Sequence, residues 1–166
     1  SLLSSMHGVW LCFTHPALSF SLLSFIIKKI SNSFNQLVRS LVLFPRVLDL
    51  FIYIKTEKPD IVHLFWGHYP VLVGYLVKEF CPDIKLTMFL GAYDLECNYG
   101  GSGYVAKISE VVWTHCRANV KKIIKLSVKP KNIKVSYRGV DFTKIKNISI
   151  NKQSCLLISA GTLDAS

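Results

Sequence analysis

Residues 61–90, IVHLFWGHYPVLVGYLVKEFCPDIKLTMFL, predict a strand, a helix and a second strand. Ile61 to Phe65 and Ile84 to Leu90 are short apolar runs containing β-branched and aromatic residues, which is typical of buried strands. Between them, Pro70 takes the favoured first-turn position of a helix expected over residues 71–80. A strand, a helix and another strand in succession predict a βαβ unit with parallel strands.

The same alternation continues toward the C-terminus. Val111 to Thr114 and Ile133 to Ser136 predict two further strands, and a basic helix is expected between them, from about Arg117 to Leu126. The predicted fold class is therefore α/β, with a Rossmann-like parallel sheet and flanking helices. Because parallel sheets bury both faces, near-continuous apolar strands are what such a sheet requires.

The first sixty residues predict helices rather than a sheet. Residues 1–16 are expected to be irregular, with a short strand at Trp10 to Phe13. Ala17 to Ile30 predicts a buried or interfacial helix, whose apolar run is about half the roughly 20 residues that a membrane span needs. Residues 34–55 predict a second helix, which Pro45 would kink or split.

Charge and cysteine content restrict the classes of function. The 166 residues carry a net charge of +10, and from Val111 to Lys152 the only acid is Asp141. Such a basic face suits nucleotide phosphates, an anionic membrane surface or nucleic acid, or is a solvated lysine-rich surface. No nucleic-acid-binding motif accompanies it, so no nucleic-acid partner is expected. The five cysteines show no CxxC spacing, which argues against a disulfide framework or zinc site and fits the reducing cytoplasm.

Candidate site residues follow from where parallel sheets bind ligands, beyond the carboxyl ends of their strands. Here that rule selects Trp66-Gly67-His68, Gly91 to Asp94, Thr114-His115 and Arg138 to Asp141. His68 can act as a base or bind phosphate, and Asp94 can accept a hydroxyl proton or hold a sugar hydroxyl. Helix capping is the plainer alternative for each of the two residues.

Two other stretches suggest a binding role. Thr114 to Asn119 lies at a strand-to-helix junction, where exposed backbone N–H groups can bind an anion. Tyr99 to Gly103, YGGSG, resembles a phosphate cradle, but it follows no predicted strand and lacks the P-loop lysine. We expect this second stretch to be a mobile loop near the site.

An ordered set of short motifs resembles the N-terminal domain of retaining glycosyltransferases of family 4, which have the two-domain GT-B fold. The motifs are KPDIVH at 58–63, GAYD at 91–94, VVWTHCRAN at 111–119 and KVSYRGVDF at 134–142. Residues 156–161, LLISAG, look like the opening strand of that family's C-terminal domain. The resemblance covers about residues 40–163.

The resemblance implies a domain organisation and a reaction. Residues 1–145 would be the Rossmann-like N-terminal domain with a truncated start, residues 146–153 an interdomain linker, and residues 154–166 the first strand of a C-terminal domain. The reaction would transfer a sugar from a nucleotide-sugar to a glycan or lipid-linked acceptor, with retention and without a metal or other cofactor. The setting would be polysaccharide or lipopolysaccharide synthesis in the cytoplasm, peripheral to the inner face of the anionic cytoplasmic membrane.

The resemblance also suggests roles for individual residues. Asp94 and His68 are the candidate catalytic residues, and Gly139 and Asp141 the candidate hinge. The candidate substrate-binding residues are Trp66, Gly67, Gly91, Tyr93, Thr114, Asn119 and Arg138. Gly91 stands where many relatives carry a histidine, so a catalytic histidine cannot be assigned there. The isolated chain is expected to be inactive as a transferase, and a non-catalytic Rossmann-like binding module is the competing interpretation.

Overall fold

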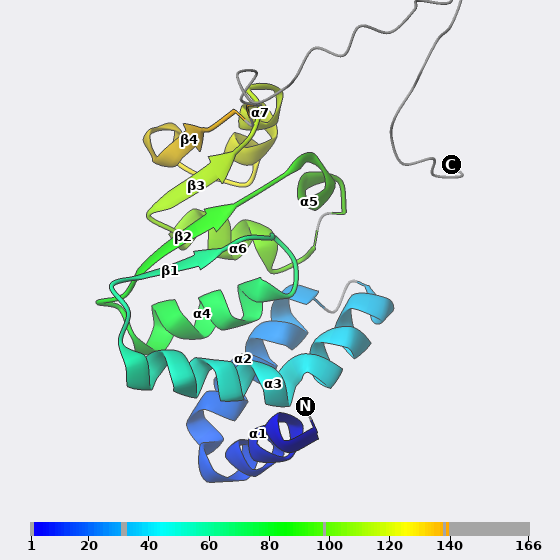
Figure 1. Ribbon diagram of the computed structural model, residues 1–166. Helices are drawn as coiled ribbons and strands as arrows, with labels where there is room; N and C mark the ends of the chain where they lie inside the picture. Colours follow the sequence, from blue (N-terminus) through cyan, green and yellow to red (C-terminus); the bar gives the residue numbers. More distant parts are fainter. Residues whose placement is uncertain (1, 31–32, 98, 138, 140–166) are drawn as a thin grey trace, which may run out of the picture.

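The computed structural model describes residues 2–30, 33–97, 99–137 and 139, with residues 2–6 described by their backbone alone. One sheet runs through the described chain, with four parallel strands in the order β1-β2-β3-β4. The strands are β1 (Ile61–Leu64), β2 (Lys85–Phe89), β3 (Val111–Thr114) and β4 (Ile133–Val135). In register, Ile61 lies beside Lys85, Thr87 beside Val111 and Val112 beside Ile133. The predicted α/β class with a parallel sheet is confirmed (Figure 1).

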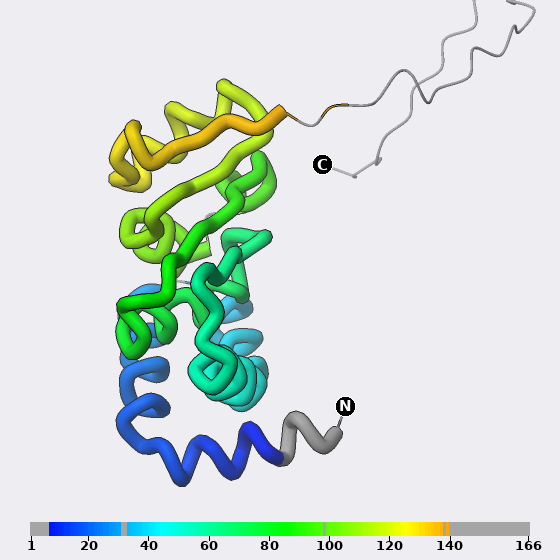
Figure 2. Tube along the Cα trace, turned by 60° about the vertical axis from the view of Figure 1, so that its left-hand side comes forward, coloured from blue at the N-terminus to red at the C-terminus, as the bar shows by residue number. Residues whose placement is uncertain are grey.

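Helices precede and connect the strands. They are α1 (Leu2–Thr14), α2 (Pro16–Ile30), α3 (Phe34–Glu57), α4 (Pro70–Phe80), α5 (Ala92–Cys97), α6 (Ser102–Ile108) and α7 (Ala118–Lys125), with a 3-10 turn at Pro130–Asn132. The three N-terminal helices gather beyond the β1 end of the sheet, and Figure 2 shows α3 nearly end-on with α2 and α1 around it. The helix predicted at 71–80 is confirmed as α4.

The sheet buries one face rather than two. Side chains on the buried face point toward the connecting helices, and Leu64 packs against Gly74 of α4. The opposite face carries exposed or half-buried residues: Ile61, His63, Phe65, Lys85, Thr87, Phe89, Val111 and Trp113. Because the strands are neighbours in chain order, right-handed crossovers place all connecting helices on the same side. The expectation of two buried faces is therefore wrong for the described residues.

Residues 2–14 form helix α1, so the predicted irregular segment with a strand at 10–13 is wrong. Leu11 is buried in the core, and the Nδ1 atom of His7 lies 2.6 Å from a carboxylate oxygen of Asp49 on α3. The Oγ1 of Thr14 donates a hydrogen bond to the carbonyl of Trp10, as it can in a helix. Packing against α3 stabilises this helix. A contact between two helices leaves no local signal in the sequence.

Helix α3 continues through Pro45 without a break. Its N-terminus is capped by Ser33, whose Oγ accepts a hydrogen bond from the Gln36 amide at 3.5 Å. At its C-terminus, Lys58 adopts a left-handed conformation with φ 49°, and its N–H donates to the carbonyl of Ile54. The helix is therefore one continuous element, and the split that Pro45 could have caused does not occur.

The stretch Tyr99 to Gly103, predicted as a mobile loop, is packed against the N-terminal helices. Tyr99 is buried, and its hydroxyl lies 2.7 Å from the hydroxyl of Ser40 on α3. The Ser40 hydroxyl also donates to the Gln36 carbonyl at 2.6 Å, so the Tyr99 hydroxyl donates to Ser40. Burial raises the pKa of Tyr99 to about 12, although the bond to Ser40 opposes the rise. The phenol is therefore neutral at physiological pH.

Glu110, just before β3, ties α4 to the sheet. Its carboxylate accepts hydrogen bonds from Lys78 Nζ at 2.6 Å and from the Leu86 amide at 2.7 Å. Burial alone would raise the pKa of this carboxyl, but the bonds from Lys78 and Leu86 outweigh it and hold the pKa below its ordinary value. The ionised form of Glu110 is therefore the one that joins helix and sheet.

The predicted linker at 146–153 and the strand beginning at 154 lie outside the described residues.

Candidate functional site

The carboxyl ends of β1 and β2 bring together four residues that the sequence selected from two separate motifs. Asp94 Oδ1 accepts hydrogen bonds from the Gly67 amide at 2.9 Å and from His68 Nδ1 at 3.0 Å. Its other oxygen accepts from the Gly91 amide at 2.9 Å. The predicted convergence of Gly67, His68, Gly91 and Asp94 at this edge is therefore what the structure shows.

Asp94 has no contact with solvent, since its side chain is 0% exposed. It lies in the first turn of α5 and reaches back to the amide of Gly91, the residue before that helix, as the acidic residue of a capping box does. The capping role that the sequence left open is thus present, together with the bonds to β1. Asp94 is not among the residues that line the cavity beside His68, and its two carboxylate oxygens accept the three hydrogen bonds that orient Gly67, His68 and Gly91.

Gly67 allows the close approach that this arrangement needs. A Cβ atom at this position would lie 2.4 Å from Leu90 Cδ2 and 3.1 Å from Asp94 Cβ. Both distances are shorter than normal carbon–carbon contact. A side chain at Gly67 would therefore displace Leu90 or the carboxylate itself.

His68 is the member of the pair that reaches solvent, with 32% of its side chain exposed. An ionised carboxylate only accepts hydrogen bonds, so the ring nitrogen that faces Asp94 must carry a proton. In the neutral imidazole the other nitrogen, Nε2, is then a hydrogen-bond acceptor. Asp94 therefore fixes the tautomer in which Nε2 is left to accept a proton or a hydrogen bond from a ligand.

A cavity of about 300 Å³ lies next to His68. It is formed by the N-terminal part of α3, the β1–α4 connection and the α5 region, and is lined by Ser33, Asn35, Gln36, Arg39, His68, Tyr69, Tyr93, Cys97 and Tyr99. Amide, guanidinium, imidazole and phenol groups make this lining more polar than a typical apolar pocket. The cavity can therefore hold a small ligand that is rich in hydroxyl or anionic groups.

Two other residues that were predicted to bind substrate lie near the imidazole of His68. The ring centroids of Trp66 and Tyr93 lie 6.0 Å and 6.4 Å from that of His68. Both aromatic side chains are exposed, and Tyr93 also lines the cavity. Their rings offer flat apolar surfaces of the kind on which a sugar ring can stack.

The remaining predicted residues lie elsewhere. Thr114 and Asn119 are both buried, and the Asn119 amide nitrogen donates to Thr114 Oγ1 at 2.9 Å, which joins β3 to α7. Neither lines the cavity beside His68. Arg138 and Asp141 lie outside the described residues. Gly139 is exposed, and a Cβ atom there would meet nothing within 4 Å.

The sequence did not point to Arg39 and Gln36, which line the cavity from α3. Helix α3 precedes β1 and is connected to it by only a short turn, so its N-terminal half returns toward the carboxyl end of that strand (Figure 1). The one available signal was that Arg39 stands among the polar residues of an amphipathic helix. That signal does not say which neighbouring element the arginine faces.

His115 lies beside the same edge of the sheet. Its ring stacks on Phe89 with centroids 5.9 Å apart, and its buried Nδ1 has no hydrogen-bond partner among the described residues. A Cβ atom at Gly91 would lie 3.8 Å from His115 Cε1 and 3.5 Å from Asp94 Oδ2, which are ordinary contacts. Within the described part of the chain, no group of three or more His, Cys, Asp or Glu side chains is placed to hold a metal ion.

Within the described ranges, no single helix has both the length and the hydropathy that a membrane span requires. His7–Thr14 and Pro16–Ile30 meet these requirements only as a pair, and that pair is bent by 101°.

A scan against models of protein families, a search of curated proteins and a search of solved structures each returned no match to the chain.

Proposed function

We propose that this chain is the acceptor-side domain of a retaining glycosyltransferase of the GT-B type. In this proposal the cavity beside His68 binds a glycan or lipid-linked acceptor. The nucleotide-sugar donor is held by a further domain, as the resemblance to family 4 implies, and no metal or other cofactor takes part. The support for this proposal is the site geometry together with the four motifs at 58–63, 91–94, 111–119 and 134–142.

The observation that carries the proposal is the bond between His68 Nδ1 and Asp94 Oδ1 at 3.0 Å. A histidine whose Nδ1–H is held by a buried carboxylate presents Nε2 as a hydrogen-bond acceptor. An acceptor sugar hydroxyl can donate to that nitrogen, which orients the hydroxyl oxygen for attack on the anomeric carbon of the donor sugar. The bond from that carbon to the phosphate of the nucleotide breaks, the nucleotide leaves, and the hydroxyl proton passes to Nε2. Asp94 acts in this scheme as a positioning residue and His68 as the residue that touches the acceptor.

Arg39 gives the proposed acceptor site a preference for anionic ligands. A guanidinium group can form paired hydrogen bonds with phosphate oxygens, and Arg39 is an exposed residue that lines the same cavity as His68. A sugar phosphate, or the phosphate of a lipid-linked sugar, would place its anionic group at Arg39 and a hydroxyl at His68. The acceptor class that fits best is therefore a phosphorylated glycan or lipid-linked sugar.

Glucose 1-phosphate binding tests the proposal. We expect amide shifts in the NMR spectrum that cluster at Arg39, His68 and Tyr93, and His68→Ala to weaken binding about fivefold, the value of one lost hydrogen bond. The matched control is His63→Ala, because His63 lies on the open sheet face and does not line this cavity. Absence of binding, or equal losses in the two variants, would contradict the proposed acceptor site.

Exposed residues on α2 support a position at an anionic membrane surface. Phe20 (76% exposed), Leu23 and Ile27 recur at helical spacing, and Lys28 and Lys29 follow in the last turn of the helix. Apolar side chains next to cations are the pattern by which helices bind the lipid–water interface. We therefore propose that α2 contacts the membrane that carries a lipid-linked acceptor.

Co-sedimentation with phosphatidylcholine vesicles, with and without phosphatidylglycerol, tests this contact. Wild-type protein is expected to bind the anionic vesicles more tightly, and Phe20→Ser to reduce that binding about tenfold, because one large apolar side chain is lost from the interface. Tyr137→Ser serves as the control, since Tyr137 is similarly exposed but follows β4 at the far end of the sheet. Binding that is the same for both vesicle types would exclude this membrane contact.

A non-catalytic binding module is the second candidate. Gly91 favours it, because this glycine stands where many relatives of the resembled family carry a histidine. A module of this kind would bind glucose 1-phosphate as above. It would not regain transferase activity when combined with any donor domain, which distinguishes the two candidates.

A further inference from the structure

An apolar groove of about 450 Å³ lies between α3, β1 and α4. All of its lining residues except Arg46, His63 and Tyr69 are aliphatic residues, phenylalanine or proline. Hydrocarbon gains free energy when it leaves water for such a surface, whereas a polar group would lose its hydration there. The groove therefore suits a hydrocarbon chain better than a polar ligand.

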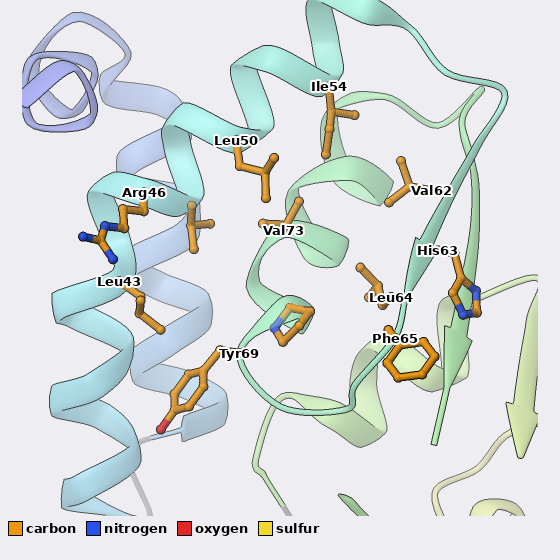
Figure 3. A pocket seen from close by; sticks show the side chains of 12 residues that line it. Leu43, Arg46, Leu50, Ile54, Val62, His63, Leu64, Phe65, Tyr69 and Val73 are labelled. Carbon is orange, nitrogen blue, oxygen red and sulfur yellow. The ribbon is translucent and has the colours of Figure 1, made fainter. Parts of the chain in front are cut away.

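The groove and the polar cavity beside His68 share Tyr69, which lines both spaces. Figure 3 shows Tyr69 near Leu43 at one end of the groove, with Ile54 and Val62 toward the other end. The centroid of the Tyr69 ring lies 5.7 Å from that of His68. An apolar space and a polar space are therefore neighbours that share one aromatic side chain.

One side of α3 continues from the cavity into the groove. The residues on this side that line one space or the other are Gln36, Arg39, Leu43, Val47, Leu50 and Ile54. They follow one another by three or four positions, the spacing of neighbours on a helix surface. From the first to the last, this side of α3 is about 27 Å long. Its first two residues are polar and line the cavity, and the other four are apolar and line the groove.

We propose that the groove holds the hydrocarbon chain of an acceptor whose phosphate lies at Arg39 in the cavity. The position of the phosphate rests on the proposed function, which places a phosphorylated acceptor beside His68. Among the acceptors considered there, the site thus takes the lipid-linked class. A ligand with an anionic head and an apolar chain occupies both spaces at once, with each part in surroundings of its own kind.

Charge supports an anionic ligand of this kind. Neither space has an Asp or Glu among its described lining residues, so no carboxylate there repels a phosphate. Arg46 also lines the groove, but it already has an interaction within the described chain. The preference for an anion is therefore assigned to Arg39, whose guanidinium can form paired hydrogen bonds with phosphate oxygens.

Alkyl phosphates of increasing chain length test the inference on the 166-residue chain. Butyl, octyl and dodecyl phosphate share one head group, and isothermal titration calorimetry below their micelle-forming concentrations gives the Kd of each. We expect binding to tighten about threefold for each methylene that enters the groove. Arg39→Ala should weaken the binding of every member about tenfold, because all of them place the same phosphate in the cavity.

Two matched variants on α3 connect the chain to the groove. Leu50→Lys places a charge inside the groove and should weaken dodecyl phosphate binding about tenfold. Butyl phosphate should bind this variant as it binds wild type, because its short chain ends before Leu50. Leu41→Lys is the control, since Leu41 is 42% exposed against 47% for Leu50 but does not line the groove. Neither site is deeply buried, so both variants should fold.

A third variant excludes binding of the chain to the exposed apolar residues of α2. Phe20 lines a separate hollow on that helix, so Phe20→Ser should leave the Kd of dodecyl phosphate unchanged. A loss in Phe20→Ser equal to that in Leu50→Lys would overturn the inference.

The outcomes separate this inference from the proposed function. If glucose 1-phosphate binds but a longer chain adds no affinity, the inference is overturned and the acceptor site stands. Equal losses in Leu50→Lys and Leu41→Lys, or chain binding that does not depend on Arg39, would also overturn it. If alkyl phosphates bind with the expected dependence on Arg39 and Leu50 while glucose 1-phosphate does not bind, the groove is a site for an anionic lipid and the sugar acceptor is contradicted.

Discussion

Replacing Asp94 by Asn is expected to lower the free energy of unfolding by roughly 3 kcal/mol. The two side chains have nearly the same shape, so the change isolates hydrogen bonding and charge from packing. The carboxylate accepts from Gly67, His68 and Gly91 within a fully buried setting. An amide has one accepting oxygen, so its NH₂ group must face an N–H group of the protein. One buried donor is then left without a partner.

Urea denaturation followed by circular dichroism measures this loss. The control is Asp83→Asn, because Asp83 is an exposed residue of the same type and should change stability by no more than about 0.5 kcal/mol. Equal unfolding midpoints for Asp94→Asn and wild type would show that the buried carboxylate does not hold β1 and α5 together. The expected loss also predicts weaker glucose 1-phosphate binding, because His68 would no longer be oriented.

Gly100→Ala is expected to destabilise the protein by roughly 3 kcal/mol, at the upper end of the usual cost of overpacking. A Cβ atom at Gly100 would lie 1.8 Å from the backbone carbonyl oxygen of Lys29 and 2.9 Å from its carbonyl carbon. These are backbone atoms near the end of α2, so no change of side-chain rotamer relieves the overlap. The connection between α5 and α6 must instead move away from α2.

Thermal unfolding provides the measurement, with a decrease in Tm of roughly 10 °C expected for a chain of this size. Gly139→Ala is the matched control, because a Cβ atom at Gly139 meets nothing within 4 Å. A wild-type Tm for Gly100→Ala would mean that the stretch from Tyr99 to Gly103 does not pack against the N-terminal helices. It would then support the mobile loop that the sequence suggested.

Part of the candidate site could be predicted from a general rule about ligand binding by parallel sheets. His68 and Asp94 are 26 residues apart, yet both follow predicted strands, so the rule that ligands bind at carboxyl strand ends placed them together. The same rule selected Thr114, which is buried and whose Oγ1 accepts a hydrogen bond from Asn119. Position at a strand end is visible in the sequence, but the direction of a side chain after the strand is not.

Arg39 and α1 were missed for a different reason. Both depend on contacts between segments that lie far apart along the chain, such as that of His7 with Asp49. Helix periodicity predicts an apolar face but not the element that covers it. Arg39 became a candidate only when the N-terminal half of α3 was seen beside the carboxyl end of β1.

Local chemistry was enough to predict the four strands of the sheet, helix α4 and the parallel α/β class, because apolar periodicity and Pro70 act within a few residues. Long-range packing was required for the rest. The chain order of the strands put the connecting helices on one side, and so left the face that carries Phe65, Phe89 and Trp113 open within the described part of the chain. The burial of Asp94, the tautomer of His68 and the cavity beside it likewise depend on segments that meet only in the folded protein.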